Sequence, residues 1–235
     1  MTLNKKLVEL AAANNAKWCS IVCQANGAPS IFREHAWFSS CMVPMYYPNI
    51  VTLKASCKSH LVESLTQMIL GKASIKDSFD SLQLPESNYQ KLFEAKWFVA
   101  SPTPSSRAPY FTIKTMLDLN KWEIAMSNSS VAGIFNYKVL SHPAVRFIAI
   151  KIGEEIVSGC VITKSKGVVG ITNFFSNTSG NAENWSICLS AARVFAGIMP
   201  VVGYTRNNNL SYGALPTSIV ELGALSVWLR KELVS

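Results

Sequence analysis

The chain has 235 residues, of which 49% are hydrophobic and 15% are charged, and its formal net charge is +8. Such a composition can bury a substantial core, which excludes an intrinsically disordered protein. The positive charge is evenly divided, since residues 1–109 and residues 110–235 each carry 11 Lys/Arg and 7 Asp/Glu. Because no basic cluster stands out, we expect no nucleic-acid partner.

The sequence also argues against a membrane or secreted protein. Arg146, Lys151 and Arg193 interrupt the most apolar stretches, so none reaches the roughly 18 residues of a membrane span. The start of the chain lacks the apolar centre of a signal peptide. We therefore expect a cytoplasmic protein without a membrane partner, with its six cysteines as reduced, buried thiols. Cys19 and Cys23 have no second Cys or His pair at ligand spacing, so we predict no metal site.

The first hundred residues predict a mixed α/β region. Hydrophobic periodicity and turn residues give a helix at 2–16, strands at 18–23, 35–42 and 46–53, a helix at 59–70, a helix from Ser74, and a strand at 91–99. The aromatic residues Trp37, Phe38, Tyr46 and Tyr47 fit either a stacking platform for a ligand or core packing, and we favour the core.

The segment 101–109 contains three prolines and three serines, which predicts an exposed connector. We therefore divide the chain into an N-terminal α/β half at 1–100, this connector, and a second domain at 110–235. Leu84, Pro85 and Trp97 recur 131 residues later as Leu215, Pro216 and Trp228. This echo indicates either that the first half is a degenerate relative of the second or that a few positions match by chance.

The second half gives the clearest pattern. A helix at 115–126 and a strand at 145–152 precede two strands joined through Lys164–Gly167, whose residues suit a hairpin turn. A glycine-containing turn at 177–182, a helix at 183–196 and a buried strand at 199–204 follow. A turn that opens a helix presents free N–H groups and the positive end of the helix dipole, which suits a phosphate. The alternative is an ordinary loop with Ser179 or Asn181 as the helix cap.

This order of elements resembles the core of the GNAT acetyltransferase superfamily. Asn177-x-x-Gly180-x-Ala182 is similar to the family's pyrophosphate loop, Gln/Arg-x-x-Gly-x-Gly/Ala, and the end of the chain, with Gly203-Tyr204 and 222–229, is similar to a bacterial GNAT-like group. The resemblance implies an α/β fold with a mixed α+β sheet, the GNAT-like acyl-CoA N-acyltransferase fold. It also implies acetyl-CoA as the cofactor, bound by Phe174, Phe175, Ser176, Asn177, Ser179, Gly180, Asn181, Ala182 and Asn207.

The same resemblance implies transfer of an acetyl group to a small-molecule or peptide amine. The family's catalytic tyrosine would fall at Ala214, so Tyr212 and Tyr204 are the candidates to protonate the leaving thiolate. The strand at 168–175 carries no carboxylate to serve as a base. We therefore hold two hypotheses: an acetyl-CoA-dependent N-acetyltransferase, or a catalytically inactive GNAT-fold binding or regulatory module.

Overall fold

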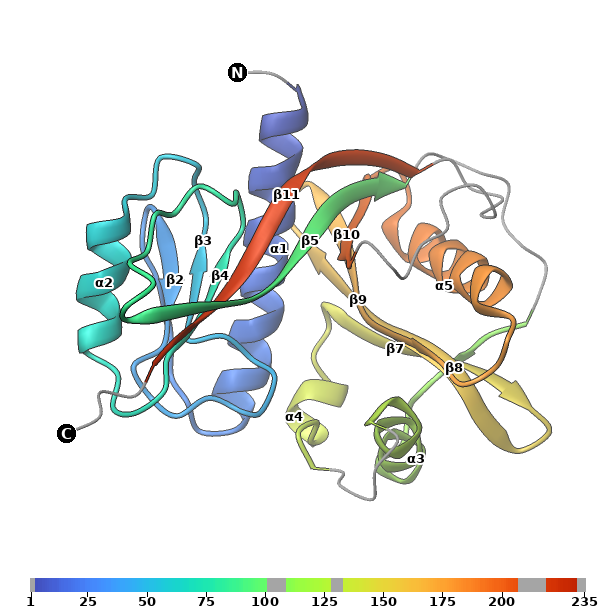
Figure 1. Cartoon of the computed structure of the whole chain (residues 1–235). Helices are drawn as coiled ribbons and strands as arrows, with labels where there is room; N and C mark the ends of the chain where they lie inside the picture. The colour runs from blue at the N-terminus through green and yellow to red at the C-terminus, as the bar shows by residue number, and fades with distance from the viewer. Residues whose placement is uncertain (1–2, 101–108, 128–132, 207–218, 232–235) are drawn as a thin grey trace. The chain divides into compact units, whose positions relative to one another are not determined.

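The computed structural model describes residues 3–100, 109–127, 133–206 and 219–231 (Figure 1). They form two compact units: residues 3–97, 205–206 and 222–231, and residues 98–100, 109–127, 133–204 and 219–221. The division falls inside two long strands, β5 (Tyr89–Ala100) and β11 (Ile219–Arg230). Since residues 101–108 lie outside the described ones, the predicted connector at 101–109 stays a prediction.

The first unit is a sheet with a parallel β-α-β crossover at its centre. Its remaining elements are α1 (Leu3–Ala25), β1 (Ile31–Phe32), β2 (Ala36–Phe38), β3 (Ile50–Thr52), α2 (Ser59–Gln67) and β4 (Ser74–Asp77). The strand order is β1-β2-β3-β4-β11-β5. β3 and β4 are parallel and joined through α2, whereas β11 pairs antiparallel with β4, Ser226–Leu229 opposite Ser74–Asp77.

Two predicted elements of this unit are wrong. The strand expected at 18–23 is part of α1, because the buried residues Ala12, Ala16, Cys19 and Cys23 recur at helical spacing and pack one face of a single long helix. The helix expected from Ser74 is instead β4, which is hydrogen-bonded by a strand on each side. At both places, tertiary contacts outweigh the local propensity of the residues: core packing for α1 and strand pairing for β4.

The aromatic residues of the first unit mostly pack in its core, as predicted. Trp37, Phe38 and Tyr47 are buried. The prediction of core packing is wrong for Tyr46, which is 83% exposed and has a positive φ of 71° in the loop before β3.

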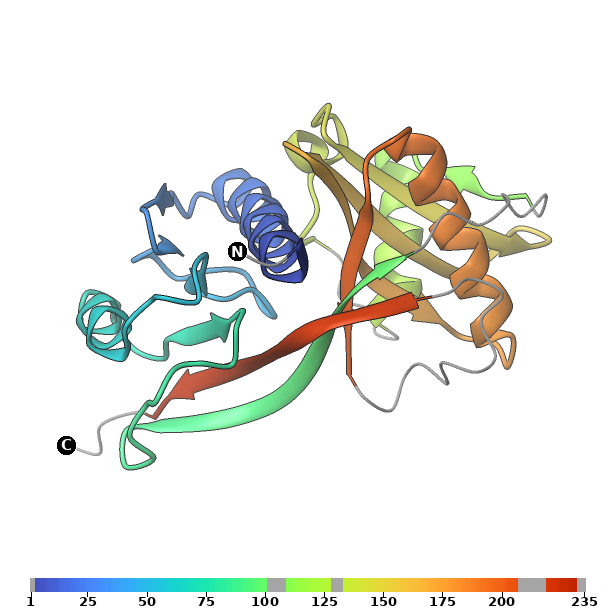
Figure 2. The same ribbon diagram turned by 90° about the horizontal axis from the view of Figure 1, so that it is seen from above.

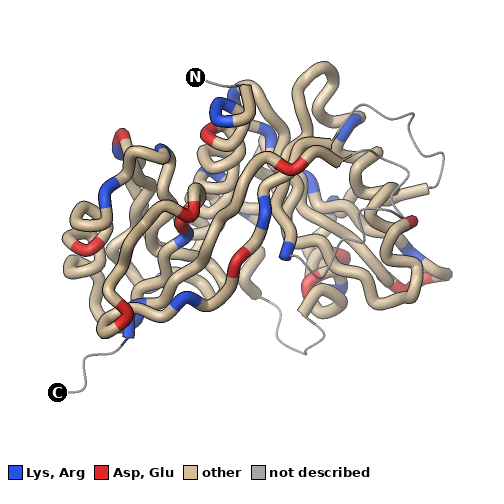
Figure 3. The backbone as a smooth tube through the Cα atoms, turned by 45° about the horizontal axis from the view of Figure 1, so that its top comes forward, with Lys and Arg blue, Asp and Glu red and all other residues tan. Residues whose placement is uncertain are grey.

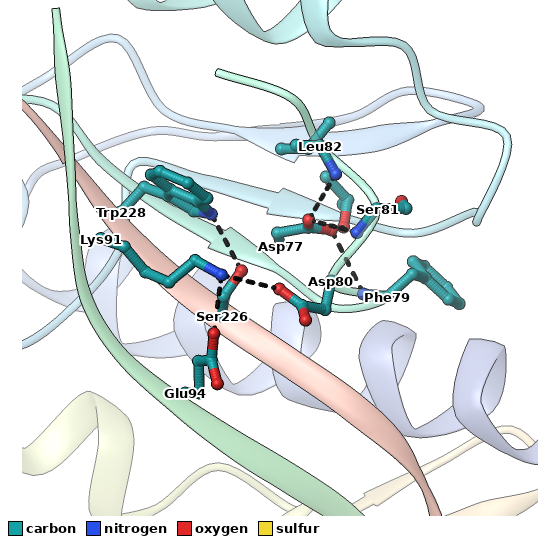
Figure 4. A network of polar contacts seen from close by, with 10 residues as sticks. Asp77, Phe79, Asp80, Ser81, Leu82, Lys91, Glu94, Ser226 and Trp228 are labelled. Carbon is teal, nitrogen blue, oxygen red and sulfur yellow. Dashed lines mark hydrogen bonds and ion pairs between the residues drawn. The ribbon is translucent and has the colours of Figure 1, made fainter. Parts of the chain in front are cut away.

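A buried carboxylate, Asp77, closes the turn that follows β4 (Figure 4). It accepts hydrogen bonds from the N–H groups of Phe79 (3.2 Å), Ser81 (2.7 Å) and Leu82 (2.8 Å) and from the Thr52 hydroxyl (3.3 Å). Burial raises the pKa of Asp77, and the three N–H donors partly oppose that shift. The carboxylate therefore holds the turn and the ends of β3 and β4 together.

The second unit is another sheet with a parallel crossover. Its elements are β6 (Phe111–Thr112), α3 (Met116–Ser127), α4 (Tyr137–Leu140), β7 (Val145–Ile152), β8 (Glu155–Ser165), β9 (Val168–Ser176), α5 (Asn181–Ala196) and β10 (Val201–Thr205). The strand order is β10-β9-β8-β7-β6, antiparallel except for β9 and β10. The helices expected at 115–126 and 183–196, the hairpin and the strand at 199–204 are confirmed.

Helices α3 and α5 cover opposite faces of the second sheet (Figure 2). Trp122 of α3 packs edge-on against Phe147 and Phe175, while α5 packs on Ile148 and Ile150. Neighbouring residues of a strand point to opposite faces. Phe147 therefore packs in the core under α3, and Ile148 packs in the core under α5. No helix among the described residues has the length and apolarity to cross a bilayer.

We predict that Asp77→Asn lowers the free energy of unfolding by about 2–4 kcal/mol, because an amide nitrogen cannot accept the buried N–H groups. The pKa of Asp77 is raised in the folded state, so the stability linked to its protonated form is complete below the unfolded pKa and is lost as pH rises through the folded value. The difference in the free energy of unfolding between wild type and variant, measured in urea titrations, should therefore narrow as the pH rises above about 4, the ordinary pKa of an aspartate.

Asp80→Asn is the matched control. It makes the same chemical change three residues away, where an ion pair with Lys91 (3.4 Å) and the repulsion between Asp80 and Asp77 are lost, and should cost about 1 kcal/mol or less. Equal losses in the two variants would contradict the role given to Asp77.

Candidate functional site

The candidate site is the crossover from β9 to α5, and its geometry begins with a β-bulge. Gly159 lies opposite Phe175 and Val161 opposite Thr172, so two residues of β9, Asn173 and Phe174, face one residue of β8. Asn173 has a φ of 50°, which asparagine tolerates better than most residues. The bulge changes the course of β9 shortly before the strand enters the loop.

β9 and β10 pair over three residues and then part. Their register joins Val169–Ile171 to Val201–Gly203. A Cβ on Gly203 would lie 2.5 Å from Cζ of Phe98 and 2.9 Å from Cγ2 of Ile171, so only glycine allows this close approach. Beyond Ile171, within the part of the chain that the structure describes, β9 continues to Ser176 paired with β8.

The side chain of Asn184 ties the loop 177–180 to α5. Its Nδ2 donates to Oγ of Ser176 (2.9 Å) and to Oγ1 of Thr178 (3.0 Å), and its backbone N–H donates to the carbonyl of Gly180 (3.0 Å). Asn184 is not among the residues predicted from the sequence. The available signal was an asparagine, a poor helix former, inside the first helical turns and after two hydroxyl residues.

Asn177, which aligns with the Gln or Arg of the family's loop, contacts a helix instead of pointing away from the protein. Its Nδ2 donates to the carbonyl of Ala125 near the end of α3 (2.9 Å), and its backbone N–H donates to the carbonyl of Val157 in β8 (2.8 Å). The loop is therefore hydrogen-bonded on both sides, to α3 and to α5.

The N-terminus of α5 is capped by Gly180 rather than by Ser179 or Asn181, so the alternative of a side-chain cap at those residues is wrong. Gly180 has φ −79° and ψ 36° and supplies no side-chain hydrogen bond. A Cβ there would meet nothing closer than 3.7 Å, so the protein itself does not require glycine at this place. The first N–H groups of a helix have no intrahelical partner, which leaves those of Asn181 and Ala182 to an external acceptor.

The predicted aromatic residues of the site point to opposite faces of the sheet. The ring of Phe174 packs against Trp185 of α5, with 4.3 Å between centroids, whereas Phe175 packs against Trp122 of α3 at 5.2 Å. Phe175 is buried, so its ring is not open to a ligand, and its carbonyl accepts a hydrogen bond from the Ser158 hydroxyl (2.6 Å). Trp185 is also buried, and its Nε1 has no hydrogen-bond partner among the described residues.

The two candidate catalytic tyrosines differ in what the structure shows. Tyr204 is half-buried in β10, and the parallel pairing places the end of β10 at the same sheet edge as the end of β9. Tyr212 and Asn207 lie outside the described residues. The roles of these three residues stay predictions.

Basic and acidic residues are interspersed along both units (Figure 3), so the local charge decides what the loop can bind. The charged residue beside the loop is Glu183, which is exposed in the first turn of α5. A carboxylate there stabilises the helix but repels an anion.

The cysteines are structural thiols. All six are free, and five are buried, Cys41 being the partly exposed one. Burial raises the pKa of Cys19 and Cys23 to about 12 and that of Cys57 to about 11, so these thiols are not nucleophiles at neutral pH. No group of three or more His, Cys, Asp or Glu side chains suited to a metal ion occurs among the described residues.

Comparison with known proteins identifies the fold. No protein-family model matches the sequence, and no curated protein matches it either. Solved structures do. A GNAT-family protein from Novosphingobium aromaticivorans superposes with a TM-score of 0.61 at 10% identity, covering 94% of this chain and 99% of that one. A GCN5-related N-acetyltransferase from Kribbella flavida gives 0.61 at 9% identity over 94% and 96%. The chain has the GNAT fold.

A third structure, a functionally unknown conserved protein from Staphylococcus epidermidis, superposes with a TM-score of 0.56 at 11% identity, covering 88% of this chain and 95% of that one. These matches confirm the mixed α/β fold and the resemblance inferred from the sequence. At such low identity they establish the fold and leave the activity to be argued from the residues.

Proposed function

We propose that the protein is an acyl-CoA-dependent N-acyltransferase that uses acetyl-CoA and binds it at the β9–α5 crossover. The observation that carries this proposal is the combination of a strand edge freed where β9 leaves β10 and a helix N-terminus without a side-chain cap. A CoA thioester offers complementary groups, since its pantetheine amides can extend a strand and its pyrophosphate suits a helix N-terminus.

The residues present fit such a ligand. The N–H groups of Asn181 and Ala182 and the backbone of Ser179 and Gly180 would hold the pyrophosphate. The backbone of Phe174 to Ser176 would pair with the pantetheine arm, and Asn177 would act by holding the loop against α3. Asn207 would complete the set. The hydrogen bonds of the loop to α3 and α5 would reduce the entropic cost of binding.

The reaction that we propose is direct transfer to an amine. The neutral amine of a small molecule or peptide attacks the thioester carbonyl, the carbon–sulfur bond breaks, and an amide and the CoA thiolate form. Tyr204 or Tyr212 would give its proton to the thiolate, and water would take the proton that the amine loses. Because all six cysteines are free, we place this activity in the reducing cytoplasm.

The rival proposal is a GNAT-fold module that binds CoA without turnover. It is favoured by the strand 168–176, which has no carboxylate to accept the proton of the amine. Binding and turnover must therefore be measured separately.

Gly180→Glu tests the binding site. A carboxylate at the cap would meet the pyrophosphate, so acetyl-CoA binding measured by calorimetry should weaken by about 100-fold or more. Gly180→Ala, for which the structure has room, and Val194→Glu, which adds the same charge to an exposed position in the last turn of α5, should bind like wild type. If Gly180→Glu binds acetyl-CoA as tightly as wild type does, the cofactor does not bind at the β9–α5 crossover.

Glu183→Gln should change affinity and stability in opposite directions. Removal of the repelling charge should tighten acetyl-CoA binding by about 3–10-fold, while loss of a favourable dipole interaction lowers stability by about 0.3–1 kcal/mol. Calorimetry and thermal unfolding of the same samples measure the two effects. Unchanged affinity would contradict a pyrophosphate at this helix end.

The tyrosines are tested by turnover. In a screen of amines with acetyl-CoA, followed by release of the CoA thiol, Tyr204→Phe or Tyr212→Phe should lower kcat about 10²–10⁴-fold with little change in acetyl-CoA affinity. Tyr110→Phe is the control. Binding without turnover of any amine in the wild type would favour the non-catalytic module.

A further inference from the structure

The place where β9 leaves β10 determines where the acyl end of a bound CoA thioester would lie, an argument that rests on the proposed function. The pyrophosphate would lie at Ser179–Ala182, and the pantetheine arm would pair with Phe174–Ser176. The thioester would therefore lie farther back along β9, near the last residues paired between the two strands, Ile171 and Gly203. The side chains around this last pair decide which acyl group the site can hold.

Aromatic rings close this place on the side of α5. Because Gly203 has no side chain, the ring of Phe98 lies across β10, with its Cζ 2.5 Å from where a Cβ of Gly203 would be. Cγ2 of Ile171 lies 2.9 Å from the same point. Trp185 packs edge-on against Phe98, with 5.9 Å between the ring centroids, and also contacts Phe174. These side chains all belong to the core under α5.

The core beside the last pair has no free space for a longer ligand. The side chain of Phe98 is completely buried, and those of Ile171 and Trp185 are 3% and 4% exposed. Protein interiors are packed as densely as organic crystals. A chain of methylene groups could therefore enter on this side only by displacing an aromatic ring.

The opposite face of the sheet is less closed and carries a candidate catalytic group. Successive residues of a strand alternate between faces, so Thr172 and Tyr204, each one residue beyond the last pair, point away from α5. Both are half-buried. If Tyr204 gives its proton to the thiolate, the amine and the leaving group lie on that face, which leaves the side of Phe98 and Trp185 to the acyl group.

We infer that Phe98 and Trp185 restrict the donor to short acyl groups such as acetyl and exclude chains of four or more carbons. The methyl group of an acetyl thioester ends at the last pair of the ladder. Each further methylene would press against the two rings, and an apolar pocket discriminates by about tenfold or more for one methylene.

Calorimetry of the full chain with CoA, acetyl-CoA, butyryl-CoA and hexanoyl-CoA tests this restriction, because the four ligands share the pyrophosphate and the pantetheine arm. Wild type should bind CoA and acetyl-CoA with similar affinity, and butyryl-CoA and hexanoyl-CoA about tenfold more weakly or worse. Hexanoyl-CoA bound as tightly as acetyl-CoA would overturn the inference and leave the proposed function standing. Failure of all four to bind would reject the CoA site itself, and the inference with it.

Variants locate the restriction. Phe98→Leu leaves space beside Trp185, so the preference for acetyl-CoA over butyryl-CoA should fall by about threefold or more. Phe147→Leu makes the same change at a buried position that packs against Trp122 on the other face, and should keep the wild-type ratio. Circular dichroism checks that each variant is folded, and if Phe98→Leu is not, Trp185→Phe replaces it. A wild-type ratio in the folded Phe98 or Trp185 variant would also overturn the assignment.

Discussion

The short ladder between β9 and β10 controls the geometry of the candidate CoA site. Val169–Ile171 and Val201–Gly203 are paired closely because Gly203 has no side chain to collide with Phe98 and Ile171. The bulge at Asn173 then alters the course of β9. If the ladder continued to the end of β9, β10 would occupy the backbone edge that a pantetheine arm needs. Strand separation, loop and helix N-terminus are thus consequences of one local arrangement.

The first unit contains the same kind of crossover, β3-α2-β4, and uses the sheet edge after β4 differently. There a buried carboxylate, Asp77, accepts the N–H groups of the turn after β4. In the second unit, the loop after β9 is held by amide side chains, Asn177 and Asn184. Amide groups add no charge, which leaves the helix dipole of α5 to determine the local preference for anions, opposed by Glu183 alone in its first turn.

The strands and helices that follow their own periodicity could be predicted from the sequence. The hairpin β8–β9 alternates along its length, and α5 carries apolar residues at helical spacing, so both were found with the glycine turn between them. Residues 18–23 and 74–77 were assigned wrongly, because their state depends on partners elsewhere in the chain: the core beneath α1, and β3 and β11 beside β4. Asn173 and Asn184 act through a bulge and a loop whose registers no local pattern specifies. The roles of Asn207 and Tyr212 rest on the resemblance alone.

The position of β11 has a consequence for synthesis of the protein on the ribosome. Ser226–Leu229 pair with Ser74–Asp77, and the Arg230 guanidinium donates to the carbonyls of Thr66, Ile69 and Gly71 at the end of α2. These residues are translated only after the whole second unit, on the order of ten seconds after β4 at the usual rate of elongation. During that interval β4 presents an unpaired strand edge. The first sheet is therefore complete only after β11 has been translated, and until then the edge of β4 is open to pairing with another strand.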